Sequence, residues 1–330
     1  RGECLFLRSW WYSNLYRVFG VVPIARTVVA PAAAKLIPRC TEEEMYTLLT
    51  EDLSEAARLL PSTPGSEKAR VANIAAYTLL AKVYLTFGKP AEAKTVLEEA
   101  MKNTAYGLET TTKRVFDVSN KMNKEIIFAL YYNKTNDNGH GYWYSANTEV
   151  LADIRNPTPE FKAIYDGEKD NRLPLISTYT KISSNLFAMN KWYDTYDATY
   201  TDQVGNDFPH LRYADVVLMY AEALAESGGS LDDALVWLNK TRVRAGLEEL
   251  TTDEVKSLAE FRRELADERG REFALEGHRW FDLVRLGLAV DYFREMGYSL
   301  DSHNLIFPIP QIQIEIVNNP SILWQNPGFN

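Results

Sequence analysis

The strongest constraint on the fold of this chain is a pair of amphipathic helical patterns within residues 73–102. Alanine, glycine and larger apolar side chains alternate there at spacings that suit two antiparallel helices, with Gly88 and Pro90 at the turn. The small residues allow the two helices to approach closely. The positions that carry the pattern are Tyr77, Leu80, Ala81, Tyr84, Gly88, Ala93, Leu97 and Ala100. A chain with this core is expected to be built mainly from packed helices.

The same spacing returns, more weakly, later in the chain, and both copies match the key positions of a tetratricopeptide helix pair. The second copy consists of Leu218, Ala221, Ala225, Gly229, Ala234 and Leu238, with a helix cap at residues 230–233. About three such units are needed for a stable free-standing stack. We therefore expect another part of the chain, residues 105–210, to cover the helices.

Other helices flank these two units. They are expected at residues 2–19, ending at Gly20, at residues 42–60, and in one long run over residues 252–286. Thr41 and Glu44 form the pattern of a capping box, and Thr251 with Glu254 is expected to cap the long helix. Its charged residues are expected to pair along the helix at i,i+3 and i,i+4 spacing, so that it serves as scaffold, with His278 in a structural role. The tail, residues 304–330, is punctuated by prolines and is expected to be extended across the helices.

The composition changes within residues 105–210 to Asn, Asp, Gly, Thr and aromatic residues. Residues 125–132 are expected to form a strand and residues 181–193 short strand-like pieces, with a polar, aromatic loop at 133–146. This segment is too long and too aromatic for a linker. The predicted fold class is mainly α: a tetratricopeptide-like helical scaffold with a loop-rich insert that contains short strands.

Charge and motifs exclude several functional classes. The net charge of −9 argues against a nucleic-acid partner, because phosphate binding needs a basic face. No membrane-spanning segment is evident. The chain begins without Met inside an expected helix, so we expect it to be the downstream part of a longer precursor. The two cysteines, Cys4 and Cys40, are predicted to be buried free thiols.

The common catalytic and metal-binding signatures are missing from the sequence, and no catalytic residue, metal site or cofactor is predicted. The four histidines do not cluster. Asp194, Asp197 and Asp202 offer oxygen ligands without the spacing of an EF-hand, so they are interpreted as solvated turn residues, and a structural calcium ion has no support. A glycoside hydrolase needs only two suitably placed carboxylates, which spacing alone cannot reveal, and this class stays open as an alternative.

Aromatic residues in the insert are the candidate binding groups. Tyr and Trp rings can stack on the apolar face of a sugar while amides and carboxylates bond its hydroxyls. The predicted ligand-binding residues are Tyr142, Trp143, Tyr144, Asn138, Asp137, Trp192 and Tyr193. An equally weighted alternative is that Trp143 and one tyrosine plug the loop onto the helices. Trp10, Trp11 and Tyr12 lie on an expected helix, and packing between helices is favoured for them.

Taken together, these stretches resemble the SusD/RagB family of nutrient-binding outer-membrane lipoproteins of Gram-negative bacteria. The most specific match is ERGREFALEGHRWFDLVRLG at residues 268–287. The other matching stretches, in the family's order, are residues 2–24, 51–61, 73–102, 211–226, 238–247 and 307–329. Residues 105–210 carry no family motif, so no ligand residue can be transferred to them.

The resemblance implies a non-catalytic receptor on the cell surface. Members are held in the outer membrane by a lipid on an N-terminal Cys and act as a lid on a TonB-dependent transporter of the SusC type. Cys4 lies inside the helical motif and is not the lipidated residue, so membrane contact would come only through an anchor that this chain lacks. Most members are expected to bind oligosaccharides, and the RagB-like branch is associated with peptides.

The combined hypothesis is a single domain of 330 residues. Residues 1–104 and 211–330 would form the helical scaffold, and residues 105–210 the variable ligand-binding insert. The protein would bind an oligosaccharide or polysaccharide with modest affinity and pass it to the transporter. A peptide-binding receptor on the same scaffold is the first alternative, and a glycoside hydrolase is the second.

Overall fold

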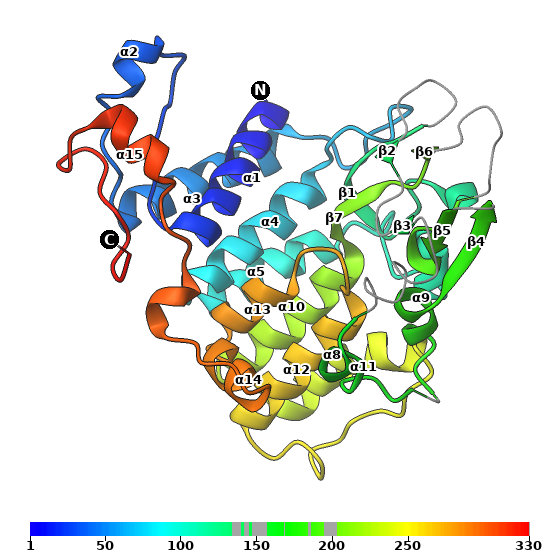
Figure 1. Ribbon diagram of the computed structural model, residues 1–330. Coiled ribbons are helices and arrows are strands. Elements are labelled where there is room, and N and C mark those ends of the chain that lie inside the picture. Colours follow the sequence, from blue (N-terminus) through cyan, green and yellow to red (C-terminus); the bar gives the residue numbers. More distant parts are fainter. Residues whose placement is uncertain are drawn as a thin grey trace.

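Helices from both ends of the chain pack into one continuous row, each against the next (Figure 1). The computed structural model describes residues 1–133, 140–141, 145–146, 157–167, 169–183, 186–194 and 203–329. The row consists, in order, of α1 (Gly2–Phe19), α3 (Glu42–Leu59), α4 (Asn73–Thr86), α5 (Pro90–Met101), α10 (Tyr213–Glu226), α11 (Leu231–Arg244) and α12 (Leu258–Glu272). The prediction of a mainly helical, tetratricopeptide-like scaffold is confirmed.

The two predicted tetratricopeptide units are the pairs α4–α5 and α10–α11, and they lie side by side because α5 packs on α10. Gly88 has a φ of 66° in the first turn, where a side chain would be strained. The helices before and after these units complete the row, since α3 packs on α4 and α12 packs on both α10 and α11. The flanking helices therefore extend the two units into a row long enough to be stable.

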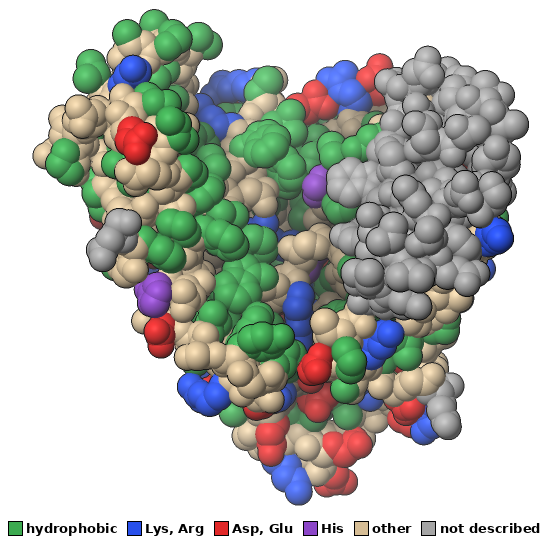
Figure 2. Space-filling view, in the orientation of Figure 1, with side chains coloured by type: hydrophobic (Ala, Val, Ile, Leu, Met, Phe, Trp, Pro, Cys, Tyr) green, Lys and Arg blue, Asp and Glu red, His purple; other side chains and the backbone are tan. Residues whose placement is uncertain are grey.

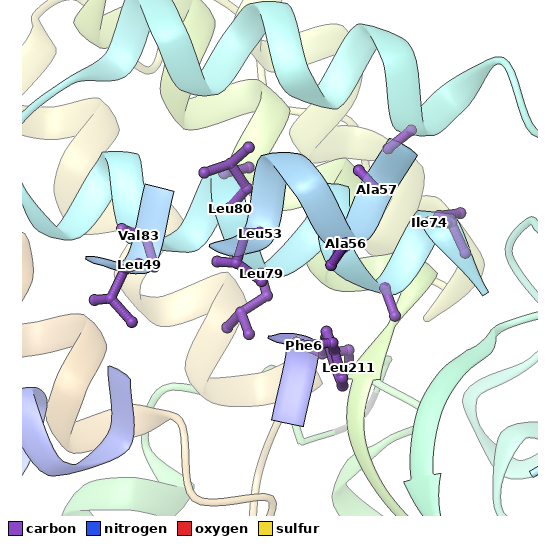
Figure 3. Close-up of a cluster of buried hydrophobic side chains, with 14 of the residues drawn as sticks. Phe6, Leu49, Leu53, Ala56, Ala57, Ile74, Leu79, Leu80, Val83 and Leu211 are labelled. Atoms are coloured by element: carbon purple, nitrogen blue, oxygen red, sulfur yellow. The ribbon is translucent and has the colours of Figure 1, made fainter. Parts of the chain in front are cut away.

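The largest hydrophobic core lies between α1, α3 and α4 (Figure 3). Phe6, Leu49 and Leu53 are completely buried there. The predicted capping box opens α3: the Thr41 hydroxyl accepts from the Glu44 amide at 3.1 Å, and the Glu44 carboxylate accepts from the Thr41 amide at 2.7 Å. Two of the amides that would otherwise lack an acceptor at the start of the helix are thereby satisfied.

The expected long helix over residues 252–286 is broken. Helix α12 begins only at Leu258, where the Ser257 hydroxyl accepts from the Glu260 amide at 3.2 Å, and it ends at Glu272. A turn follows in which Leu275 and Gly277 have φ values of 65° and 80°. The chain then continues as α13 (Arg279–Arg285) and α14 (Ala289–Glu295).

The strands lie in the segment between the two halves of the scaffold. Strand β1 (Ile126–Leu130) pairs antiparallel with β7 (Phe208–Arg212), and this pair contacts α4. The predicted strand at 125–132 is therefore confirmed. The remaining strands are β2 (His140–Gly141), β3 (Ser145–Ala146), β4 (Tyr179–Ser183), β5 (Leu186–Met189) and β6 (Gln203–Val204). They form a β2–β6 pair and a β3–β5–β4 sheet.

Short helical elements fill the connections. They are α2 (Pro31–Ala34), α6 (Thr112–Val115), η1 (Val118–Asn120), α8 (Pro159–Lys162), α9 (Leu173–Ser177), η3 (Asn190–Trp192), η4 (Ser302–Leu305) and α15 (Gln311–Val317). The tail is thus only partly extended. It packs on the scaffold as predicted, because the Phe307 amide donates to the Val18 carbonyl at 2.8 Å.

Two smaller expectations can be compared with the structure. Cys40 is a buried free thiol as predicted, whereas Cys4 is a free thiol that is exposed, because it lies on the outer side of α1. Among the described helices, none combines the length and apolarity needed to cross a membrane.

A candidate ligand-binding cleft

A cleft opens beside α1, between the helical scaffold and the strand pair β1–β7. Its cavity has a volume of about 370 Å³. Figure 2 shows histidine and basic side chains in the hollow middle of this face. The lining residues that matter for ligand binding are Trp10, Trp11, Asn14, Arg17, His210 and Phe281. The cleft therefore combines aromatic rings with an amide and a guanidinium group.

The aromatic wall of the cleft comes from α1. Trp11 is 60% exposed, and its ring meets that of Trp10 edge-on at a centroid distance of 4.7 Å. Trp10 in turn contacts the His210 ring at 4.8 Å, on strand β7. Trp10 is held between α1 and the strand pair, as expected for a packing residue, whereas Trp11 presents its indole to solvent. An exposed indole in a hollow is a large, stiff contact surface.

The polar groups of the cleft also come from α1. The Asn14 side chain donates to the Trp10 carbonyl at 2.7 Å and accepts from Nη2 of Arg17 at 2.5 Å. The Arg17 guanidinium lies 4.4 Å from the centre of the Phe281 ring. Burial lowers the pKa of Arg17 to about 10, so the group is still charged at neutral pH.

A second cavity of about 390 Å³ continues the cleft along α1. Arg17, Lys82, His278 and Phe281 line both cavities. Arg17 therefore stands at the junction of the two hollows.

A buried set of ion pairs forms the floor of the cleft. Its cations are Lys82, Arg269 and Arg285, and its carboxylates are Asp215, Asp282 and Glu222. Asp215 forms ion pairs with Lys82 at 2.5 Å and with Arg269 at 2.8 Å. Burial alone would raise the pKa of Asp282, but the adjacent Arg269 and Arg285 lower it to about 2. Burial lowers the pKa of His278 to about 3, so this ring is neutral at pH 7.

A second buried network ties the strand pair to α12. Arg212, at the end of β7, contacts Glu125 at 2.8 Å, Glu272 at 2.6 Å and Glu276 at 2.8 Å. Arg244 also contacts Glu125 and Glu272, at 2.7 and 2.5 Å. The charged residues of this segment were expected to pair locally along one helix. Arg269, Glu272 and Glu276 instead pair with distant elements, and the break after α12 brings Glu276 to Arg212.

The structure describes only some of the ligand residues that were predicted in the insert. Asp137, Asn138, Tyr142, Trp143 and Tyr144 lie outside the described residues. Tyr193 is described and is 39% exposed, and it lines a smaller hollow of about 240 Å³ with Asn190 and Asp117.

The prediction that Trp192 contacts a ligand does not agree with the structure. Its side chain is only 1% exposed, and its ring stacks on Phe208 at 5.3 Å and meets Phe116 edge-on at 5.0 Å. No face of the indole is free to receive a sugar. Trp192 instead supports Phe208, which itself lines the cleft.

The sequence reasoning missed Trp11. Phe6, Ser9 and Ser13 are the buried side of α1, and a wheel of 100° per residue turns Trp11 away from that side. The structure defines this buried side, and two of its three residues are serines, so apolar spacing in the sequence does not mark Trp11 as exposed.

The described residues hold no cluster of three or more potential metal ligands. Asp194, one of three aspartates weighed as a calcium ligand, is buried and accepts from the Gly205 amide at 2.9 Å. Asp197 and Asp202 lie outside the described residues.

Comparison with known proteins decides the family. The profile described as "SusD family" matches residues 172–329, and the profile described as "Starch-binding associating with outer membrane" matches residues 1–85. The chain belongs to the SusD/RagB family. The second match falls on the N-terminal part of the scaffold, and the first begins inside the insert and runs through the C-terminal part of the scaffold, so residues 86–171 lie outside both.

One relative of this SusD-family chain is similar over nearly its whole length, and another over part of it. SusD-like protein P2 of Formosa agariphila is 28% identical, and the alignment covers 99% of this chain and 73% of the relative. The starch-binding protein SusD of Bacteroides thetaiotaomicron is 36% identical over 140 residues, which is 40% of this chain and 23% of the relative.

Solved structures agree with the fold. A laminarin-binding SusD-like protein superposes with a TM-score of 0.74 at 27% identity, covering 99% of this chain and 78% of that one. A SusD superfamily protein from Bacteroides vulgatus gives a TM-score of 0.79 at 24% identity, covering 99% and 77%. The arrangement of helices and short strands is thus that of the family.

Proposed function

We propose that this SusD-family chain is a non-catalytic carbohydrate-binding protein whose ligand lies in the cleft beside α1. The observation that carries this proposal is the exposed indole of Trp11 in a hollow that also presents Asn14 and Arg17. The ring offers a stacking surface to the apolar face of a sugar, and the polar side chains offer partners to its hydroxyls. Two similar proteins, the starch-binding protein SusD and a laminarin-binding SusD-like protein, support the same ligand class.

The insert is proposed to complete the site. It returns to the scaffold through β7, whose Phe208 and His210 line the cleft. We propose that Tyr142, Trp143 and Tyr144, with Asp137 and Asn138, contribute further contacts to the same ligand, and that Tyr193 contributes where the ligand extends beyond the cleft.

A binding role, rather than hydrolysis, is supported by the state of Glu276, which lines the cleft, and of Asp282, which lines the second cavity. A glycosidase needs a protonated carboxylic acid, whose pKa is raised. Burial would raise the pKa of Glu276, but Arg212 and Lys191 lower it, and Arg269 and Arg285 lower that of Asp282. Both groups are therefore ionised and paired at neutral pH, and neither suits the role of general acid.

We further propose that the protein works at the outer membrane, where a lipid anchor would hold it and a SusC-like TonB-dependent transporter would receive the glycan. The support is the family profile that matches residues 1–85, which describes proteins that associate with the outer membrane. A receptor that must release its cargo suits an affinity near the micromolar range, or about −8 kcal/mol.

Isothermal titration calorimetry against a panel of polysaccharides and peptide digests tests this proposal. Wild-type protein would be compared with Trp11→Ala and Trp143→Ala, and with Tyr298→Ala as a control for an exposed aromatic residue that does not line the cleft. Saturable binding of one glycan class, weakened at least tenfold by Trp11→Ala and unchanged by Tyr298→Ala, is expected. The titrated samples would show no increase in reducing ends.

Three results would contradict the proposal in different ways. Binding of peptides alone would move the protein to the peptide-binding branch of the family. Time-dependent release of reducing ends would make it a hydrolase. Glycan binding that Trp11→Ala leaves unchanged would keep the receptor but exclude the cleft as its site.

A further inference from the structure

We infer that the glycan recognised in this cleft is acidic, and that Arg17 binds its carboxylate or sulfate group. This inference rests on the proposed function and specifies the ligand class of the same site. It follows from the pairing of charges around the cleft, from the surroundings of the Arg17 guanidinium, and from the distance between Arg17 and Trp11 along α1.

The ion pairs beneath the cleft are balanced without Arg17. Three cations, Lys82, Arg269 and Arg285, share three carboxylates, Asp215, Asp282 and Glu222. Arg17 is an additional cation without a direct ion pair among the described residues, although Asp282 and Asp215 act on it at longer range and raise its pKa against the effect of burial. With His278 neutral, Arg17 is the one cation of the described cleft floor that has no directly paired carboxylate.

The guanidinium of Arg17 is also short of hydrogen-bond partners. Nη2 donates to the Asn14 side chain, and the face of the group rests on the Phe281 ring. Its Nε is shielded from solvent and finds no acceptor among the described residues. A half-buried guanidinium that has, within the described part of the chain, a free N–H donor and no directly paired carboxylate would favourably bind an anion that enters the cleft.

The chemistry of the guanidinium favours an oxyanion with two or more oxygens. Its planar fork of N–H donors matches a carboxylate or a sulfate, and charge-assisted hydrogen bonds of this kind are about twice as strong as neutral ones. Lys82 lines the same two cavities and adds to the positive field there, although it is already paired with Asp215. The site therefore suits an anionic substituent better than a neutral hydroxyl.

The position of Trp11 indicates that the anion is carried by a saccharide. Trp11 and Arg17 line the same cavity and are six positions apart on α1, which is about 9 Å along the helix axis at 1.5 Å per residue. A sugar unit stacked on Trp11 and an acidic unit held by Arg17 would be separate units of one chain. The predicted ligand is thus an oligosaccharide in which uronate or sulfated units alternate with, or follow, units that offer an apolar face.

Titration with matched charged and neutral probes tests this inference. The probes are oligogalacturonate, the same oligosaccharide after methyl esterification, a sulfated galactan oligosaccharide, laminarin oligosaccharides and inorganic sulfate. The variants are Arg17→Gln, Arg17→Lys and the control Arg26→Gln, which removes an exposed arginine that does not line the cleft. Circular dichroism melting of the ligand-free variants shows whether each has folded.

At least one acidic oligosaccharide is expected to bind at least tenfold more tightly than the neutral probes. Its affinity should fall at least tenfold in Arg17→Gln, fall less in Arg17→Lys, which keeps the charge but loses the fork, and stay unchanged in Arg26→Gln. Raising the salt concentration should weaken binding to wild type more than to Arg17→Gln.

The other outcomes separate this inference from the proposed function. Neutral glycan binding that Arg17→Gln does not alter would overturn the acidic ligand and leave the glycan receptor intact. Thermal protection by inorganic sulfate alone, lost in Arg17→Gln, would overturn the saccharide as the source of the anion. Failure of every acidic probe and of sulfate to bind or protect would overturn the anion site itself.

Discussion

At the scale of single residues, the molecule is distinguished by arginines buried among carboxylates. Arg172, Arg212 and Arg269 are at most 1% exposed, and each touches at least two acidic side chains. A buried pair of this kind contributes little net stability, but loss of one partner leaves an uncompensated charge. These residues therefore hold together elements that are distant in the sequence.

Arg212→Met should destabilise the protein by about 3–5 kcal/mol, because it would leave Glu125, Glu272 and Glu276 without one of their cations. Arg17→Met should change the free energy of unfolding by less than about 1 kcal/mol in the absence of ligand, because no carboxylate loses a partner. Urea denaturation followed by circular dichroism would measure both. Equal losses in the two variants would contradict the distinction between paired and unpaired arginines.

Stability should fall as the pH is lowered from about 6.5 towards 4, and His278 should account for part of that fall. Burial lowers the pKa of His278 to about 3 in the folded protein, whereas it is about 6.5 in an unfolded chain. Between these values the unfolded state binds the extra proton, so acid favours unfolding. The pH dependence of the unfolding free energy should be flatter in His278→Asn than in wild type, and parallel curves would contradict this assignment.

At the scale of elements, short sequence patterns predicted the features that depend on residues close together in the sequence. The spacing of small residues predicted the pairs α4–α5 and α10–α11, and the Thr41–Glu44 pattern predicted the start of α3. The break after α12 could not be predicted in this way. At the break, Glu276 contacts Arg212 and Lys191, two residues that are more than 60 positions away in the sequence.

The capping box makes a separate contribution that can be measured. Thr41→Ala should reduce the free energy of unfolding by about 1 kcal/mol, because the Glu44 amide would lose its acceptor. Thr95→Ala, at an exposed position inside α5, is a matched control and should change it by less than about 0.5 kcal/mol. Urea denaturation midpoints would separate the two. A loss in Thr41→Ala no larger than in the control would show that the cap contributes nothing.

At the scale of the whole molecule, the sequence predicted the scaffold better than the site. Hydrophobic periodicity reports which side of a helix is buried, and so the row of helices followed from it. A binding cleft depends on which side chains meet across elements, and the meeting of Trp11 on α1 with His210 on β7 and Phe281 on α13 has no local signature. Trp192 shows the converse: a polar, aromatic surrounding sequence suggested exposure, but packing on Phe208 buries it.

Hydroxyl-radical footprinting with and without the glycan identified by titration tests the central claim most directly, because it reports the solvent exposure of individual aromatic side chains. The account predicts that the bound glycan strongly reduces labelling of Trp11, which is 60% exposed in the cleft. Labelling of Tyr298, which is 64% exposed and does not line the cleft, should be unchanged. Unchanged labelling of Trp11 at a saturating glycan concentration would contradict the assignment of this cleft as the binding site.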